Sequence, residues 1–345
     1  MKAAVFERVG RMVVREVPDP ACDAGGIVVR VKACGICGSD ARNYRAGLRT
    51  GATGQVMGHE IAGVVERAGA ACTRFHEGDA VAVAPDVSCG RCRFCARGLV
   101  NLCLEHRMIG THWPGGFAEK LALPGEVMER GIMHPIPAGL EFRHAALAEP
   151  LSSVLAAQET AGIGPGRSVA VFGDGPVGCM HVQIARWRGG SPVILAGRRR
   201  LALAAAFHPD LAVNVASEDP VPAIRRATDG RGVDVAIIAT PAAESQEQGI
   251  GCVDKRGTVV LFGGLPRGDP FARLHANRIH YDELRVVGSF SYTAREHAEA
   301  LEAIRDGRVT ADALISRVVP LQGIVEAIRD SERGKVLKVI VDPWM

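Results

Sequence analysis

The chain of 345 residues is long enough to form two domains, each with its own hydrophobic core. Hydrophobic residues make up 47% of the chain, charged residues 23%, and the formal net charge of +3 argues against binding to nucleic acid or to a membrane surface. No apolar run reaches the roughly 20 residues of a spanning helix, and the first residues lack the apolar stretch of a signal peptide. We therefore expect a cytoplasmic protein whose ten cysteines are thiols or metal ligands rather than disulfides.

The first 150 residues predict a small β-barrel domain. Short valine-rich stretches alternate with glycine, which is typical of strands separated by tight turns. The expected strands are Ala3–Phe6, Met12–Val17, Ile27–Ala33, Ile61–Glu66 and Ala80–Ala84.

This first domain carries a candidate metal site. Cys37, His59 and Glu60 offer a thiolate, an imidazole and a carboxylate, which can form the three-ligand set of a catalytic zinc with one open position. Each residue alone has a simpler interpretation, since Cys37 could be a buried thiol and His59 a core histidine. A redox pair of Cys34 with Cys37 is a weaker alternative, because no thioredoxin-like βαβ pattern surrounds it.

Four further cysteines follow at the spacing C-x2-C-x2-C-x7-C. An all-thiolate set of this kind closes a tetrahedral zinc site and leaves no position for a substrate, so the predicted zinc is structural. The alternatives are an iron–sulfur cluster and a zinc ribbon that binds nucleic acid. The bacterial [4Fe–4S] motif has a proline after its last cysteine, where this chain has Leu104. The four residues are Cys89, Cys92, Cys95 and Cys103.

After residue 150 the pattern changes to alternating helices and strands. A helix is expected from Pro150 to Gly162, followed by the six strands of a doubly wound parallel sheet. Two helices, Glu296–Arg305 and Leu321–Arg329, and a strand at Lys335–Val341 that returns to the first domain complete the chain. The six expected strands are Ser168–Phe172, Val193–Ala196, Ala212–Val215, Val233–Ala239, Thr258–Phe262 and Leu284–Val287.

Residues 173–178 read G-D-G-P-V-G directly after the first of these six strands. A G-x-G-x-x-G turn between a strand and a helix is a dinucleotide-binding fingerprint, because its glycines let the backbone approach a pyrophosphate at the helix N-terminus. A tight turn without a ligand is the alternative. The predicted cofactor contacts are Gly173, Gly175, Pro176, Val177 and Gly178.

The end of the second strand indicates which dinucleotide is bound. The acidic residue that would bind the ribose 2′-hydroxyl of NAD is absent there, and Gly197 is followed by Arg198, Arg199 and Arg200. Arginines at this position suit a 2′-phosphate, so NADP(H) is favoured over NAD(H). The alternative is that the arginines form a solvated surface, where water and salt weaken their repulsion.

Together these residues resemble the zinc-containing medium-chain dehydrogenase/reductase superfamily, in its sorbitol and threonine (polyol) dehydrogenase branch. The matching motifs are G-I-C-G-S-D at 35–40, G-H-E at 58–60, the four cysteines and A-E-P-L-S at 148–152. The resemblance implies an α/β protein with a GroES-like β-barrel catalytic domain at residues 1–152 and 292–345. A doubly wound parallel-sheet (Rossmann) cofactor domain at 153–291 is inserted into it.

The resemblance also assigns roles to single residues. The catalytic zinc would be bound by Cys37, His59, Glu60 and Glu149, either glutamate directly or through water. Ser39 would hydrogen-bond the alcohol oxygen and begin proton removal. Where many relatives have a proton-relaying histidine, this chain has Arg42, which cannot act as a base near neutral pH. Further cofactor contacts are implied for Thr240, Gly263, Ser289, Phe290 and, near the pyrophosphate, Lys338. The segment Phe290, Ser291 and Tyr292 would approach the substrate.

The predicted function is a zinc-dependent, NAD(P)-dependent dehydrogenase with two zinc ions per chain. It would transfer a hydride between the cofactor and a secondary alcohol of a polyol, sugar, cyclitol or amino alcohol, with zinc lowering the pKa of the alcohol. The resemblance favours a homo-oligomer, a tetramer rather than a dimer. There are two alternatives. One is a binding protein that is stabilised by metal ions and senses redox state, and the other is a zinc-free reductase of the same superfamily.

Overall fold

The computed structural model describes residues 1–345, which separate into two compact units. Unit 1 comprises Met1–Ser152, Tyr292–Gly307 and Ala311–Met345, and unit 2 comprises Ser153–Ser291 and Arg308–Thr310. No helix is both long enough and apolar enough to cross a bilayer.

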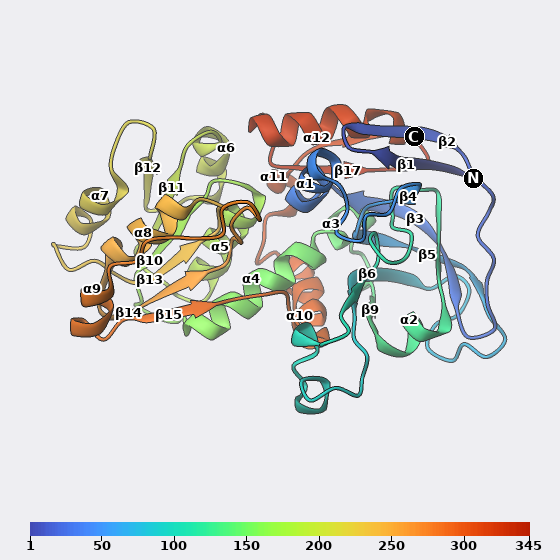
Figure 1. Ribbon diagram of the computed structural model, residues 1–345, viewed down its shortest axis with the longest axis horizontal. Coiled ribbons are helices and arrows are strands. Elements are labelled where there is room, and N and C mark those ends of the chain that lie inside the picture. The colour runs from blue at the N-terminus through green and yellow to red at the C-terminus, as the bar shows by residue number, and fades with distance from the viewer. The chain divides into compact units, whose positions relative to one another are not determined.

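Unit 1 is built on two largely antiparallel sheets (Figure 1). The larger has the strand order β16-β17-β3-β5-β6-β7, with β8 also paired to β3 and β9 to β6, and the smaller has the order β2-β1-β4. Because β17 pairs with β3, the prediction that the last strand returns to the first domain is confirmed. The strands are β1 (Lys2–Arg8), β2 (Arg11–Glu16), β3 (Ile27–Gly35), β4 (Gln55–Val56), β5 (Glu60–Ala68), β6 (Ala80–Val87), β7 (Arg107–Met108), β8 (Lys120–Leu123), β9 (Gly131–Pro135), β16 (Ile315–Val319) and β17 (Lys338–Val341).

The core of unit 1 fixes where the chemically active residues lie. Val29, Ile61 and Val83, from three neighbouring strands, are almost fully buried in one cluster, and burying each such side chain contributes about 1.5–3 kcal/mol. The pairing of β3 with β5 sets Gly35 opposite Glu60. The residues that follow β3 and those that begin β5 therefore lie side by side.

The helices of unit 1 are short and cover the sheets. In α10, Thr293 and Glu296 form a capping box that satisfies free N–H groups at the helix start. The helices are α1 (Gly38–Ala46), α2 (Gly125–Arg130), α3 (Phe142–Ala145), the start of α4 (Ala148–Ala161), α10 (Ala294–Arg305), α11 (Ala311–Leu314) and α12 (Ile324–Arg333), with 3-10 turns η1 (Cys95–Arg97), η2 (Val100–Leu102) and η4 (Leu321–Gly323).

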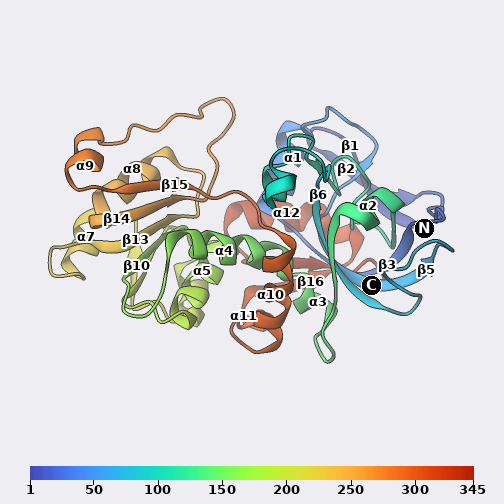
Figure 2. The same cartoon turned by 90° about the horizontal axis from the view of Figure 1, so that it is seen from below.

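Unit 2 is a six-stranded, wholly parallel sheet with the order β12-β11-β10-β13-β14-β15, so the predicted doubly wound fold is confirmed. Helix α5 lies on one face and α8 on the other (Figure 2), which explains why the central strands β10 and β11 are continuous apolar runs. The strands are β10 (Val169–Phe172), β11 (Val193–Gly197), β12 (Leu211–Asn214), β13 (Val233–Ile238), β14 (Val253–Leu261) and β15 (Arg285–Gly288). The helices are α5 (Pro176–Trp187), α6 (Leu201–Ala204), α7 (Pro220–Arg226), α8 (Ala243–Cys252) and α9 (Ala276–Tyr281), with a 3-10 turn η3 (Ala205–Phe207).

Four short strands of unit 1, β4, β7, β8 and β9, were not predicted, and two further strands differ from the prediction. β14 begins at Val253, five residues before the expected Thr258, through a segment with polar residues that hide the strand pattern. β16 was not predicted, because Ser316 and Arg317 interrupt its apolar run, and the strand is held by its parallel pairing with β17.

Candidate functional site

Cys37 lies where β3 ends and α1 begins. It is the N-cap of α1, its sulfur accepts a hydrogen bond from the Ser39 N–H at 3.5 Å, and its own N–H donates to Asp40 Oδ2 at 2.9 Å. The Cys37 sulfur therefore lies at the N-terminus of α1, where the helix dipole favours negative charge.

His59, directly before β5, is oriented by a carboxylate. Its Nδ1 lies 3.5 Å from Asp40 Oδ1, and its Nε2 lies 3.5 Å from the Ser39 hydroxyl. Burial disfavours a charge on this imidazole, but Asp40, with help from Cys37, raises the pKa of His59 well above its usual value. A carboxylate behind a histidine is the arrangement that orients metal-binding imidazoles, and the local field favours a cation.

Glu60 begins β5 and is completely buried against Lys338 of β17. The Lys338 ammonium lies 2.7 and 2.8 Å from the two carboxylate oxygens and also donates to the Ile36 carbonyl at 3.0 Å. Lys338 itself is only 2% exposed. The structure thus places Lys338 beside Glu60 in unit 1, and the pyrophosphate contact that the resemblance implies for it stays a prediction. Gly35 is needed here, since a Cβ there would lie 1.9 Å from Glu60 Oε2.

The possible ligand atoms of Cys37, His59 and Glu60 all lie within 4.8 Å of one another. Sulfur, nitrogen and oxygen donors around one point, with a field that favours positive charge, fit a zinc ion. The structure therefore brings together three of the four residues expected at this site.

Glu149, at the start of α4, is not part of that group of donors. Its Oε1 accepts a hydrogen bond from the Tyr292 hydroxyl at 2.7 Å. Burial raises the pKa of Glu149 to about 7, with His59 opposing the rise. The Tyr292 ring in turn stacks on His297, whose Nδ1 lies 2.8 Å from His134 Nδ1. No pattern along the sequence linked these histidines to Glu149.

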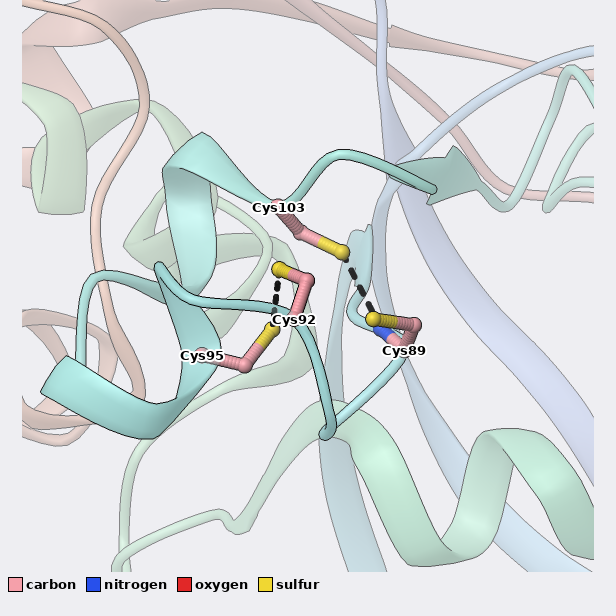
Figure 3. A group of neighbouring side chains, drawn as sticks. All are labelled: Cys89, Cys92, Cys95 and Cys103. Carbon is pink, nitrogen blue, oxygen red and sulfur yellow. Dashed lines mark hydrogen bonds between the residues drawn. The ribbon is translucent and has the colours of Figure 1, made fainter.

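The four-cysteine segment forms the second group of metal donors in unit 1. Figure 3 shows its four sulfur atoms facing one another, with the Cys89 N–H donating to Cys103 Sγ at 3.1 Å. The backbone N–H groups of Cys95 and Leu104 lower the pKa of Cys92 to about 6, which favours its thiolate. All ten cysteines are free thiols. The donor set fits an all-thiolate zinc site.

The fingerprint turn in unit 2 has the backbone that a nucleotide requires. Gly173 has a φ of +119°, and a Cβ on Gly178 would lie 1.7 Å from the Gly173 carbonyl oxygen. Gly175 caps α5, and Pro176 begins it. The turn borders a cavity of about 450 Å³. Of the predicted cofactor contacts, the cavity is lined by Gly173, Gly197, Arg198 and Thr240.

The other predicted contacts in unit 2 lie outside that lining. Gly263 packs on the Thr240 backbone, where a Cβ would come within 2.6 Å of the carbonyl oxygen. The Ser289 N–H donates to the Leu261 carbonyl at 3.2 Å, and the next side chain, Phe290, is 59% exposed.

The sequence prediction overlooked Asp174 within the fingerprint. Its Oδ2 accepts the backbone N–H groups of Arg198, Arg199 and Arg200 at 2.8, 2.7 and 2.6 Å. A Cβ on Gly197 would lie 2.4 Å from the Asp174 Cβ. The space for an acidic residue at 197 is therefore filled by Asp174, and the same carboxylate fixes the backbone of the three arginines.

Family models and relatives agree with this arrangement. Residues 23–135 match the alcohol dehydrogenase GroES-like domain, and residues 176–306 match the zinc-binding dehydrogenase domain. The sorbitol dehydrogenase of Halalkalibacterium halodurans is 30% identical over 99% of both chains. A probable D-xylulose reductase A of Aspergillus terreus is 33% identical over 92% of this chain and 91% of its own.

Solved structures show the same fold. A putative zinc-binding dehydrogenase from Sinorhizobium meliloti, bound to NADP, superposes with a TM-score of 0.91 at 35% identity and 99% coverage of both chains. The alcohol dehydrogenase TADH from Thermus sp. ATN1 gives a TM-score of 0.90 at 28% identity, again with 99% coverage of both chains. The chain thus belongs to the zinc-binding medium-chain alcohol dehydrogenase family, in its polyol dehydrogenase-like branch.

Proposed function

We propose that the protein is a zinc-dependent dehydrogenase that interconverts a secondary alcohol and its ketone, with a polyol, sugar, cyclitol or amino alcohol as substrate. The observation that carries this proposal is the convergence of sulfur, nitrogen and oxygen donors from Cys37, His59 and Glu60. The names of the relatives, which act on sorbitol and xylulose, support a polyol.

When bound, zinc would supply Lewis-acid chemistry toward the alcohol oxygen, and a nicotinamide would accept the hydride. Asp40 holds the His59 ring, and Lys338 holds the Glu60 carboxylate, so both donors are oriented in advance. Ser39, whose hydroxyl lies 3.5 Å from His59 Nε2, would accept the proton of the alcohol and pass it to water. Tyr292 would keep Glu149 turned toward the site.

Two zinc ions per chain are part of this proposal, one at Cys37, His59 and Glu60 and one at the four cysteines. The first site has an open position and should lose its metal to a chelator before the second does. Elemental analysis during chelation, followed together with turnover, tests this order. Fewer than one zinc per chain in active protein would contradict it.

A preference for NADP(H) is the second part. Gly197 and Arg198 line the cavity of unit 2. The similar structure that is bound to NADP supports a cofactor with a 2′-phosphate. A hydrogen bond to a charged group contributes roughly 1.5–3 kcal/mol, so one arginine contact predicts about tenfold tighter binding of NADPH than of NADH. Fluorescence titration at fixed ionic strength should show this ratio collapse in Arg198→Ala and remain in Arg231→Ala, an exposed arginine of the same unit. Equal affinities in the unmodified protein would refute the preference.

The substrate is identified by a panel of polyols, amino alcohols and cyclitols tested with both cofactors and followed by the absorbance of reduced nicotinamide. We expect turnover of at least one secondary alcohol, and no turnover of any would count against the proposal. The family resemblance also favours a tetramer over a dimer. Light scattering that gave a monomer mass of 36.5 kDa would exclude both.

A further inference from the structure

A cavity in unit 1 extends from the catalytic donors to a group of basic side chains that the proposed reaction does not use. Ser39 and His59 line part of this cavity, and Arg42, Arg49 and His112 are among the residues that line the rest. Arg42 belongs to α1, and Arg49 follows three residues after that helix ends.

These two arginines have no acidic partner. Asp40 is the only carboxylate in the lining, and it is already bound to His59 and to the Cys37 N–H. Arg45, on the same helix but outside the cavity, pairs with Glu332 at 2.6 Å. Neither Arg42 nor Arg49 has such an ion pair. The cavity therefore has an excess of positive charge that unit 1 does not neutralise.

His112 adds a neutral donor to the same cavity. Its Nδ1 accepts the Met108 N–H at 3.0 Å, which leaves the proton of the neutral ring on Nε2. Partial burial, followed by Arg107 and Arg49, lowers the pKa of His112. The ring is thus an uncharged N–H donor at neutral pH, beside two permanent cations.

We propose that this cavity binds an anionic group on the alcohol substrate, a carboxylate or a phosphate, so that the substrate is an acidic or phosphorylated polyol rather than a neutral one. The planar guanidinium of Arg42 or Arg49 matches either anion with two parallel hydrogen bonds. Asn43 and Thr111, also in the lining, supply polar side chains for the remaining hydroxyl groups. This inference rests on the proposed dehydrogenase function.

The test compares matched substrates on the zinc-loaded enzyme with NADP. One series is xylitol, xylonate and xylitol 5-phosphate, and the other is sorbitol, gluconate and sorbitol 6-phosphate. We expect kcat/KM for a carboxylate or a phosphate member to exceed that of its neutral counterpart by about tenfold or more, and to fall with added salt. The member with the higher kcat/KM shows whether the cavity prefers a carboxylate or a phosphate.

Variants assign the gain to the cavity. The ratio of anionic to neutral kcat/KM should fall toward one in Arg42→Met or Arg49→Met, recover partly in the matching lysine variant, and remain unchanged in the control Arg45→Met. Neutral substrates equal to or better than both anions would overturn the inference while leaving the dehydrogenase function intact. A ratio that survives both methionine variants would also overturn it, as would a change confined to the dissociation constant of NADPH.

A binding measurement separates the two proposals. Calorimetry should detect xylonate or xylitol 5-phosphate binding that both methionine variants weaken, and much weaker binding of xylitol. If this binding occurs but no alcohol is turned over, the dehydrogenase proposal fails and the anion site stands. If neither anion binds more tightly than xylitol, the anion site is refuted.

Discussion

The two groups of metal donors in unit 1 are built in opposite ways. The four cysteines all come from the loop after β6, and backbone N–H groups of the same loop lower the pKa of Cys92. Cys37, His59 and Glu60 come from two separate strand ends, and their partners include Lys338, which is 278 residues from Glu60 in the chain. Loss of a site that is held by its own loop should lower mainly the stability of the protein. Loss of a site that is held by the tertiary fold should lower both activity and stability.

The largest effect should follow loss of a catalytic donor. Lewis-acid stabilisation contributes several kcal/mol to the transition state, so Cys37→Ala or His59→Ala should lower kcat by about a thousandfold or more. Cofactor binding should be nearly unchanged, since the fingerprint and its cavity belong to unit 2. Steady-state kinetics, zinc analysis and a cofactor titration measure the three quantities, with Cys72→Ala as a cysteine control. Turnover at the original rate in either variant would show that the metal lies elsewhere.

The next effect concerns the partner of Glu60. Lys338→Met leaves a buried carboxylate without its cation, and breaking a buried ion pair costs about 3–5 kcal/mol. We expect the midpoint of urea unfolding to fall accordingly in protein from which a chelator has removed the zinc proposed at Cys37, His59 and Glu60. The double variant Lys338→Met with Glu60→Leu removes both charges and should regain part of the stability. A single variant as stable as the original would mean that the pair contributes little.

A cysteine of the four-cysteine loop should give a smaller catalytic effect. Cys92→Ser should remove one zinc per chain and lower thermal stability, because a structural zinc contributes directly to folding. kcat/KM at low temperature should change by no more than about tenfold. Zinc analysis, calorimetry and kinetics on the same preparation test this. A thousandfold loss of kcat/KM in folded protein would erase the contrast between the two sites.

The smallest effect is a pH dependence of stability caused by His297, which stacks on Tyr292, the hydrogen-bond partner of Glu149. Burial, assisted by His134, lowers the pKa of His297 to about 3. Because the unfolded chain binds this proton near pH 6.5 and the folded chain does not, stability is complete above that pH and falls as the pH drops toward 3. The slope reaches at most about 1.4 kcal/mol per pH unit. Urea unfolding between pH 7 and 4 should be less acid-sensitive in His297→Gln, whereas the exposed control His76→Gln should retain the original slope. Equal slopes in all three proteins would contradict this.

Sequence spacing was most informative where the structure is local. Four cysteines within one loop must lie close together whatever the rest of the chain does, and a glycine fingerprint between a strand and a helix constrains its own backbone. The parallel sheet was equally accessible, because its central strands β10 and β11, covered on both faces, are apolar along their whole length. The polyol dehydrogenase resemblance rested on these local motifs.

Tertiary contacts decided the electrostatics, which no spacing encodes. The pairing of β3 with β5 and β17 buries Lys338 beside Glu60, a contact that their separation of 278 residues does not reveal. Asp174 fills the space beside Gly197 because β10 and β11 are neighbours in the sheet. The sequence alone determined which groups are present and how each short segment folds. Only the packing of distant strands determined which charges meet, because the free energy of a buried charge depends on the neighbours that replace water around it.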